Sequence, residues 1–390
     1  MTRSRLLVAL VLSLCCAAGA TQSGDIEPKI PPGYTPQRGE DEQGLWLEVD
    51  DYEKRVRASA LVIREPELNE YVRNAACRVA GDYCEDLRIY VIRNPGFNAS
   101  MTPNGMMQVW TGLLLRVTSE DELAAVLGHE LAHYTQLHTL DRLRRMRAVY
   151  TAGSLVDLGL LVLAGVTIPA GQMAATLDAM SFSREQEEEA DLLGAQFMAS
   201  SGYDPRAAAQ VWEQIIDEEK KASAKRREPD IFSKTHPNPS DRVRALKQHV
   251  DSRYGDTSPS DAGRVRHVAI LNRYYMMLME DQIDTNRFGR TAAMLERHKR
   301  IGVEPGLVAF FHGEMYLQRD QAGDIDRARK AFQQAIEHGA PPAQAYRNLA
   351  YLQFKRGETE EAMKNFGEYL RRAPEASDRE MIEFYLEDNR

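Results

Sequence analysis

Helical periodicity dominates the pattern of apolar and polar positions along this chain of 390 residues. Residues 52–80, 119–138 and 183–200 each place apolar side chains on one helical face, and each is predicted to be a helical stretch. A further helix is expected after Asp204-Pro205, because a capping residue followed by proline is typical of a helix start. The pattern therefore predicts a mainly α-helical protein.

Two short segments are typical of strands: residues 87–92 alternate apolar and polar residues, and residues 106–110 look like a second strand. Residues 87–92 and 106–110 are predicted to form a small sheet, which makes the surrounding region an α+β domain. Residues 21–45 are rich in proline, glycine and charge, and they are expected to form an extended arm. The predicted domain with the sheet therefore covers residues 46–255.

The first twenty residues have the pattern of a secretory signal peptide. Arg3 and Arg5 precede an apolar run over residues 6–14, and Ala18-Gly19-Ala20 supplies a small-residue cleavage site. A buried N-terminal helix is the alternative. Anchoring as a lipoprotein is less favoured, since Cys15 and Cys16, which follow the run, lack the usual small residue before them.

Residues 152–171 form the most apolar segment after the signal peptide. Its length approaches that of a membrane span, but Asp157, Gly159 and Pro169 interrupt it. We expect a buried hairpin or lid over a functional site, with membrane contact as the alternative.

The C-terminal region carries an internal repeat of 34 residues. Glycine recurs at 323 and 357, alanine at 328 and 362, and phenylalanine at 332 and 366. This period and order resemble the tetratricopeptide repeat, in which each unit is a pair of antiparallel helices. Residues 262–390 are therefore predicted to be an α-helical repeat domain that serves as a binding module. Helical hairpins of another kind are the alternative.

Composition and charge narrow the function. A net charge of -9 without a separate basic stretch argues against a nucleic acid partner. After signal cleavage only Cys77 and Cys84 remain, and in an oxidising compartment they are expected to form a disulfide. Two buried free thiols are the alternative. Neither arrangement offers cysteine ligands for a metal, so metal chemistry would depend on histidines and carboxylates.

One predicted helix carries the sequence His129-Glu130-Leu131-Ala132-His133. Histidines four apart project from one helical face and can bind the same zinc ion. Glu130 lies beside them, and we expect it to act as the general base of a metallopeptidase without binding the metal. A solvated helix face with two histidines is the alternative interpretation.

The helix at residues 183–200 begins with a second motif. Arg184, Glu187, Ala190 and Asp191 match Arg-x-x-Glu-x-x-Ala-Asp, and here the chain resembles the gluzincin peptidases related to HtpX and the CAAX prenyl proteases. The resemblance implies one zinc ion per chain, with Glu187 as its third protein ligand. It also implies that Asp191 hydrogen-bonds to a ligating histidine. By spacing alone three other acids of this helix are rivals: Glu185, Glu188 and Glu189.

Two further features fit this family. Asn98, Ala99 and Gly105 precede residues 106–110, where relatives carry an edge strand that holds an extended substrate. His236, in a loop, is expected to stabilise the oxyanion or to bind zinc as a fourth ligand, unless it has neither role. His138 is expected at the surface.

Signal peptide, peptidase and repeat domain in this order resemble the periplasmic proteases of outer-membrane protein quality control. The resemblance implies a zinc endopeptidase that cleaves unfolded or misassembled envelope proteins and reaches the outer-membrane assembly machinery through its repeats. Peripheral membrane contact is compatible with this function. The alternatives are a chaperone or assembly factor whose zinc site is mostly closed, and an integral membrane protease.

Overall fold

The computed structural model describes residues 25–149, 181–221, 234–237, 240–255, 261–339 and 341–388. The predicted signal peptide and the predicted lid at residues 152–171 lie outside these ranges. In the described part no helix is long and apolar enough to cross a membrane.

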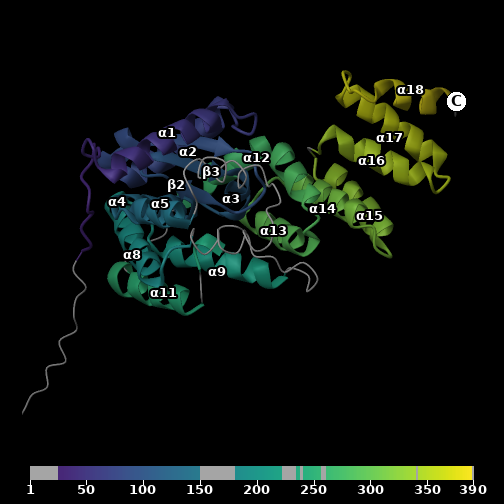
Figure 1. Ribbon diagram of the computed structural model, residues 1–390. Coiled ribbons are helices and arrows are strands. Elements are labelled where there is room, and N and C mark those ends of the chain that lie inside the picture. Colours follow the sequence, from purple (N-terminus) through teal and green to yellow (C-terminus); the bar gives the residue numbers. More distant parts are fainter. Residues whose placement is uncertain are drawn as a thin grey trace, which may run out of the picture.

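The N-terminal two thirds of the chain surround one small sheet with helices (Figure 1). In chain order the elements of this region are α1 Asp41–Ala58, α2 Pro66–Ala80, the 3-10 helix η1 Gly81–Asp86, β1 Arg88–Ile92, β2 Ala99–Met101, β3 Met106–Trp110, α3 Thr111–Arg116, α4 Glu120–Thr135, α5 His138–Val149, α8 Arg184–Ser200, α9 Arg206–Lys221 and α11 Ser240–Tyr254. This mainly helical architecture with a small sheet confirms the predicted fold class.

The predicted arm and the helical stretch after it need correction. The arm was expected to extend to residue 45, but α1 begins at Asp41, where two acidic residues favour the positive end of the helix dipole. The stretch 52–80 is two helices rather than one. Pro66 opens α2, and the residue before it, Glu65, is extended because proline disfavours helical geometry at the preceding position.

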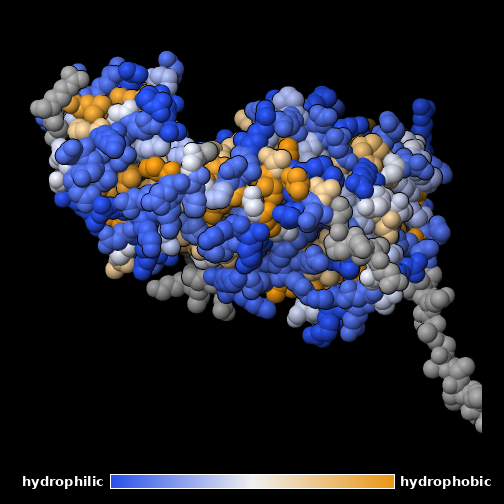
Figure 2. Space-filling model, turned by 180° about the vertical axis from the view of Figure 1, so that it is seen from behind, coloured by the Kyte–Doolittle hydropathy of each residue, from blue (hydrophilic) through white to orange (hydrophobic). Residues whose placement is uncertain are grey.

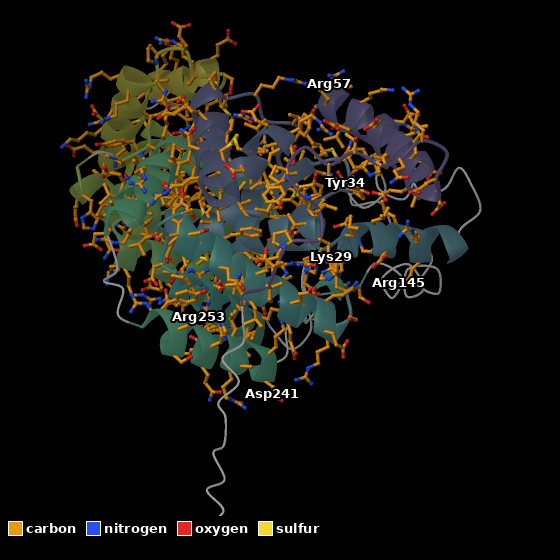
Figure 3. The ribbon with its side chains drawn as sticks, turned by 90° about the vertical axis from the view of Figure 1, so that its left-hand side faces the viewer. Lys29, Tyr34, Arg57, Arg145, Asp241 and Arg253 are labelled. Carbon is orange, nitrogen blue, oxygen red and sulfur yellow. A yellow bond between two sulfur atoms is a disulfide. The ribbon has the colours of Figure 1, made fainter. Side chains whose placement is uncertain are left out.

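The described part of the arm packs along the helix-and-sheet region, residues 41–254. The backbone N–H groups of Lys29 and Ile30 donate to the carbonyl of Thr135, at 3.1 and 3.3 Å. The hydroxyl of Tyr83 donates to the carbonyl of Ile30 at 2.7 Å. Lys29 is labelled on the face shown in Figure 3. The arm thus satisfies a carbonyl at the C-terminal end of α4, which helix geometry leaves without an intrahelical partner.

The sheet has the strand order β1-β3-β2, with β1 parallel and β2 antiparallel to β3. The two predicted strands are present, but residues 106–110 form the central strand and not the edge. The two edge strands are β1 and β2, and β2 has three residues, too few to show a period in the sequence. Gly105, in the turn between β2 and β3, has φ +86°, and a Cβ there would lie 2.1 Å from the carbonyl oxygen of Asp86.

Helix α4 runs through the core of this region, and its residues are buried on all faces. The Ser119 hydroxyl caps the helix by accepting from the N–H of Glu122. The Glu122 carboxylate accepts from the N–H of Thr118 at 2.6 Å, one residue earlier than a capping box would require. The helix ends at Thr135, before the predicted limit, because Leu137 takes a left-handed conformation with φ 59°.

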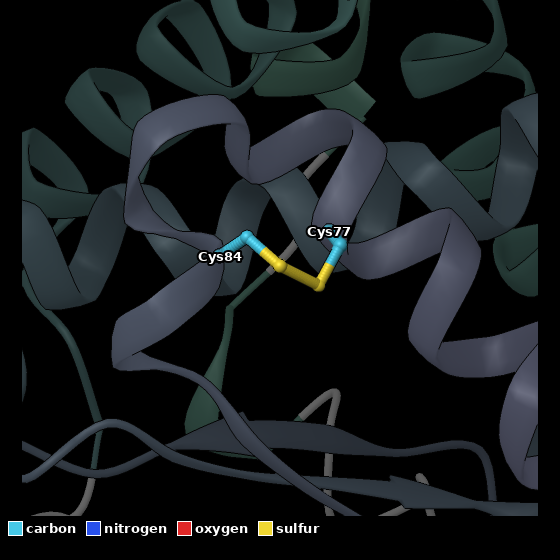
Figure 4. Close-up of a disulfide and its surroundings, with 2 residues drawn as sticks. All are labelled: Cys77 and Cys84. Carbon is cyan, nitrogen blue, oxygen red and sulfur yellow. A yellow bond between two sulfur atoms is a disulfide. The ribbon is translucent and has the colours of Figure 1, made fainter.

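Cys77 and Cys84 are joined by a disulfide at the end of α2 (Figure 4). It closes a short loop around Gly81, whose φ of 55° is easier for glycine than for other residues. The bond ties η1 to α2.

The C-terminal helices extend away from the helix-and-sheet region as a row of antiparallel hairpins (Figure 1). They are α12 Asp261–Asp284, α13 Phe288–Ile301, α14 Pro305–Arg319, α15 Asp324–Glu337, α16 Ala343–Phe354, α17 Thr359–Arg372 and α18 Arg379–Asp388. The alanines and phenylalanines that recur every 34 residues are fully buried in the α14–α15 and α16–α17 pairs: Ala328, Phe332, Ala362 and Phe366. Assignment to the tetratricopeptide class stays a prediction.

A buried ion network joins the C-terminal helices to the helix-and-sheet region. Glu218 on α9 accepts from Arg116 on α3 and from Arg297 on α13, each at 2.8 Å. Arg116 also donates to Gln282 on α12 at 3.2 Å. All four side chains are at most 7% exposed, so neither guanidinium has water as a replacement partner.

We expect Glu218→Ala to lower the free energy of unfolding by about 3–5 kcal/mol, because it leaves two buried guanidinium groups without their carboxylate. Denaturant unfolding of the mature chain measures this change. Asp217→Ala is the matched control, since the neighbouring Asp217 forms an exposed ion pair with Lys221 and should change stability by at most about 1 kcal/mol. Equal effects of the two variants would contradict the structural role of the network.

His298 makes the same interface sensitive to acid. Its Nε2 donates to the carbonyl of Leu115 at 2.7 Å, so its Nδ1 accepts from the Tyr275 hydroxyl at the same distance. Burial lowers the pKa of His298 from 6.5 to about 3. As the pH falls from about 6.5 towards 3, the unfolded chain therefore gains a proton that the folded chain does not, and stability declines.

We expect His298→Gln to make the loss of unfolding free energy with falling pH shallower, by up to about 1.4 kcal/mol per pH unit below pH 6.5. Urea unfolding at several pH values between 7 and 4.5 measures the slope. His338→Gln removes an exposed histidine and should leave the slope unchanged. A parent slope equal to that of His298→Gln would refute this assignment.

Candidate active site

Helix α4 carries the side chains of His129 and His133 into the interior, where they are 2% and 0% exposed. Their Nε2 atoms lie 3.1 Å apart. The ring of His129 packs edge-on against Trp212, and Phe182 stacks on His133 with ring centroids 3.7 Å apart. These contacts hold both rings with their Nε2 atoms towards the same point.

Helix α8 brings Glu187 to that point. The helix begins with a capping box between Ser183 and Gln186. Glu187 is fully buried, with Oε1 3.4 Å from Nε2 of His133 and Oε2 3.6 Å from Nε2 of His129. Of the four acidic residues that spacing alone left as candidates, Glu187 is the one that the structure places beside both histidines.

A pair of glycines lets α8 approach α4 closely enough for this contact. A Cβ on Gly194 would lie 3.0 Å from the backbone nitrogen of His129, and a Cβ on Gly128 would lie 3.3 Å from the carbonyl oxygen of Gly194. Any side chain at Gly194 would therefore press on the backbone that carries the first histidine. Sequence reasoning missed this pair, because a glycine within a helix pattern does not reveal which partner it approaches.

His236 completes the cluster from the segment before α11. Its Nδ1 lies 2.9 Å from Oε1 of Glu187 and 3.3 Å from Nε2 of His129. Its side chain is 2% exposed. His129, His133, Glu187 and His236 thus form a buried group whose ligand atoms all lie within 4.8 Å of one another.

The spacing of these atoms fits one tetrahedral metal ion. Ligands about 2.0–2.1 Å from a tetrahedral zinc ion are roughly 3.3 Å from each other. The distances given above, which count both carboxylate oxygens of Glu187, run from 2.9 to 3.6 Å, and one ligand atom from each of the four residues lies within 4.8 Å of the others. Without an ion, nitrogen lone pairs and carboxylate oxygens would face one another in a site closed to water, so the donor set is better explained by a metal.

Burial and neighbouring side chains together set the protonation states of His133 and Glu187. Burial lowers the pKa of His133 well below 6.5, which leaves the imidazole neutral with a free lone pair. Burial alone would raise the pKa of Glu187, but the neighbouring His236 and His133 hold it well below 4.5, so the carboxylate is ionised.

Glu130 lies on the side of the cluster where His236 enters. Its Oε1 is 3.5 Å from Nε2 of His236, and its side chain is 2% exposed. Burial raises the pKa of Glu130 above 4.5, against the opposing effect of His236 and His129. A carboxylate with a raised pKa is a stronger base, which suits a residue that accepts a proton near neutral pH.

Asp191 and Arg242 contact the cluster through His129 and Glu187. Oδ1 of Asp191 accepts from Nδ1 of His129 at 3.0 Å, in the contact that the family resemblance implied. Arg242 on α11 donates to both oxygens of Asp191, at 2.7 and 2.9 Å, and also lies against Glu187. Arg242 follows the His-Pro sequence closely, but its role depends on how α11 packs against α8, which the sequence does not reveal.

His138 was expected at the surface, but the structure buries it, with 2% of the residue exposed. Its Nδ1 is 3.1 Å from Nδ1 of His133. The prediction continued α4 as far as His138 and so placed this residue on an outer turn. Leu137 instead turns the chain, and His138 begins α5 against the end of α4.

The predicted substrate residues lie around the edge strand. Ala99 is the first residue of β2, opposite Val109 of β3, and Asn98 precedes it and accepts from the N–H of Trp110 at 3.0 Å. Gly105 lies in the turn that follows. Among the described strands, β2 pairs only with β3, so its other edge has no strand partner there.

Comparison with known proteins assigns the region that holds this cluster. Residues 63–250 match the model of peptidase family M48. The chain carries an M48 peptidase domain. This assignment confirms the metallopeptidase family expected from the two sequence motifs, and together with the buried His-His-Glu-His group it identifies zinc as the metal.

Proteins similar to this chain include two bacterial proteases and a mitochondrial metalloendopeptidase. The chain is 27% identical over 316 residues to the beta-barrel assembly-enhancing protease of Escherichia coli K12, covering 74% of this chain and 64% of the relative. The candidate beta-barrel assembly-enhancing protease of Vibrio cholerae is 31% identical over 251 residues, 62% of this chain and 51% of the relative. The mitochondrial metalloendopeptidase OMA1 of Schizosaccharomyces pombe is 32% identical over 169 residues, 41% and 45% of the two chains.

The chain thus spans about half to two thirds of the length of these two bacterial relatives. Both bacterial names describe proteases that enhance β-barrel assembly, and the mitochondrial name describes a metalloendopeptidase. The similarity supports a metalloprotease.

Proposed function

We propose that this chain is a zinc endopeptidase of the bacterial cell envelope that degrades misfolded or stalled outer-membrane and other envelope proteins. The observation that carries the proposal is the buried group of His129, His133, Glu187 and His236 with Glu130 beside it. A signal peptide and a disulfide both fit the oxidising periplasm.

The chemistry divides between metal and protein. Zinc bound by His129, His133 and Glu187 supplies Lewis acidity, which stabilises negative charge on a peptide carbonyl and makes water nucleophilic at neutral pH. Glu130 accepts a proton from the attacking water and delivers it to the leaving amine. His236 would close the site as a fourth ligand, and the effect of its removal on cleavage decides whether it also donates to the oxyanion.

Substrates are expected to bind as extended segments along β2. An unfolded segment can add to a sheet edge through main-chain hydrogen bonds, with little dependence on side chains. Strand β2, which begins at Ala99, packs against α4, the helix that carries His129 and His133. A segment that adds to β2 would therefore bind beside that helix. This mode of binding suits unfolded or misassembled envelope proteins of many sequences.

The C-terminal helices are proposed to recruit these clients or the outer-membrane assembly machinery. Apolar surface gathers on them in the view of Figure 2. On α18, Met381 and Phe384 are 50% and 65% exposed. Large exposed apolar side chains of this kind are typical of protein interaction sites.

A second function, as a chaperone or assembly factor, is favoured by the position of His236. Four protein ligands fill a tetrahedral zinc site and leave no position for water. A chain in this state binds clients without cleaving them. Envelope integrity in cells that carry Glu130→Gln separates the two functions, because full complementation would make the chaperone role dominant.

Casein cleavage by the purified mature chain tests the proposal. We expect slow cleavage that a strong chelator abolishes and that added zinc restores, since the metal is needed for both charge stabilisation and water activation. Cleavage that persists after complete removal of the metal would contradict a zinc-dependent mechanism.

A further inference from the structure

The two histidines of α4 differ in what holds their outer nitrogens. His129 donates directly to the carboxylate of Asp191 at 3.0 Å. His133 has no carboxylate at the corresponding position. Its Nδ1 lies instead 3.1 Å from Nδ1 of His138, whose Nε2 lies 3.1 Å from Oε2 of Glu189 on α8.

The positions of the protons in these two hydrogen bonds follow from which nitrogen of His133 faces the metal site. Nε2 of His133 faces the cluster, so in a neutral ring that binds a metal through Nε2 the proton is on Nδ1. Nδ1 of His138 must then accept this proton, which puts the proton of His138 on Nε2. That proton points to the Glu189 carboxylate, which can only accept. Each of the two hydrogen bonds therefore has one donor and one acceptor.

The backbone is shaped to make this contact. Leu137 is one of three described residues other than glycine with positive φ, and this conformation turns the chain between α4 and α5. The turn brings His138 back onto His133, five positions earlier. Phe182 stacks on His133 and lies 6.5 Å from the ring of His138, so both imidazoles are kept away from water.

We propose that His138, oriented by Glu189, is a positioning residue that fixes the tautomer and the ring orientation of the metal ligand His133. The inference rests on the proposed zinc site and adds to it the hydrogen-bond partner of its second histidine. Partners of this kind typically change metal affinity 10- to 100-fold when removed.

The test is the zinc dissociation constant of the mature chain, measured by competition with a chelator of known affinity. His138→Ala removes the acceptor and should raise the constant about 10- to 100-fold. His138→Asn should retain most of the affinity, because its side-chain oxygen can accept near the place of Nδ1. The denaturant concentrations at which the metal-free forms of the two variants unfold are the control. If these are similar, a difference in zinc affinity between His138→Ala and His138→Asn reports the hydrogen bond and not a general loss of structure.

Glu189→Gln tests the outer partner without depending on the fold of the His138 variants. It keeps an acceptor but removes the charge, so we expect a smaller rise of about threefold or more. Glu185→Gln is its matched control, since Glu185 is exposed on the same helix. We expect no change there.

Two outcomes would overturn the inference and are distinguishable. A parent chain that binds no zinc would overturn the proposed function and the role of His138 with it. A parent chain that binds zinc no more tightly than His138→Ala, or Glu189→Gln indistinguishable from Glu185→Gln, would overturn the positioning role alone.

Discussion

Glu130→Gln is expected to lower the rate of casein cleavage by about a hundred- to ten-thousandfold, the range over which general acid–base groups contribute to enzymatic rates. The amide has nearly the shape of the carboxylate but cannot accept the proton of the attacking water. Zinc binding should be retained, because Glu130 lies beside the four-residue group and is not part of it. Cleavage kinetics and zinc content measured on the same preparation check both statements.

Glu185→Gln is the matched control for this result, because it makes the same chemical change at an exposed position of α8. It should cleave casein at the rate of the parent. Cleavage by Glu130→Gln at that rate would remove Glu130 as the base. Loss of zinc from Glu130→Gln would instead mean that the carboxylate contributes to the metal site.

The second large effect is expected at His236, and it goes in the opposite direction. His236→Ala removes the ligand atom that lies 2.9 Å from Glu187 and so opens a position in the cluster. If the closed arrangement holds about nine tenths or more of the chains, opening it raises casein cleavage about tenfold or more. Initial rates at equal zinc occupancy measure the change.

His249→Ala is a suitable control, since this histidine lies on α11, near His236 in sequence, but is only partly buried and lies outside the cluster. No change in rate is expected from it. A decrease with His236→Ala at full zinc occupancy would assign His236 to the chemical step as an oxyanion donor. It would also argue against closure of the resting site.

The parts of the fold that the sequence predicts are those with a strong local signal. The active-site helix, the helix that carries Glu187 and the strands at 88–92 and 106–110 all have clear periodicity or capping residues. The two motifs likewise name His129 and Glu187, which the structure then places 3.6 Å apart. Local pattern is sufficient for these helices and strands because each is a single element, whereas the choice of Glu187 among the acids of its helix came from the family resemblance.

What the sequence does not predict depends on contacts between elements. Gly194 has meaning only beside Gly128, and Arg242 only beside Asp191. The burial of His138 follows from one left-handed residue, Leu137, which no propensity would place in that conformation. These residues come together through tertiary packing, and a single sequence carries no signal for it.

The zinc content of the purified mature chain tests the central claim most directly. The account predicts about one zinc ion per chain, because one buried group of three histidines and one glutamate has the spacing of a single tetrahedral site. Glu187→Ala removes the carboxylate from that group and should lose most of the metal. A parent chain without zinc under metal-replete conditions would contradict the account.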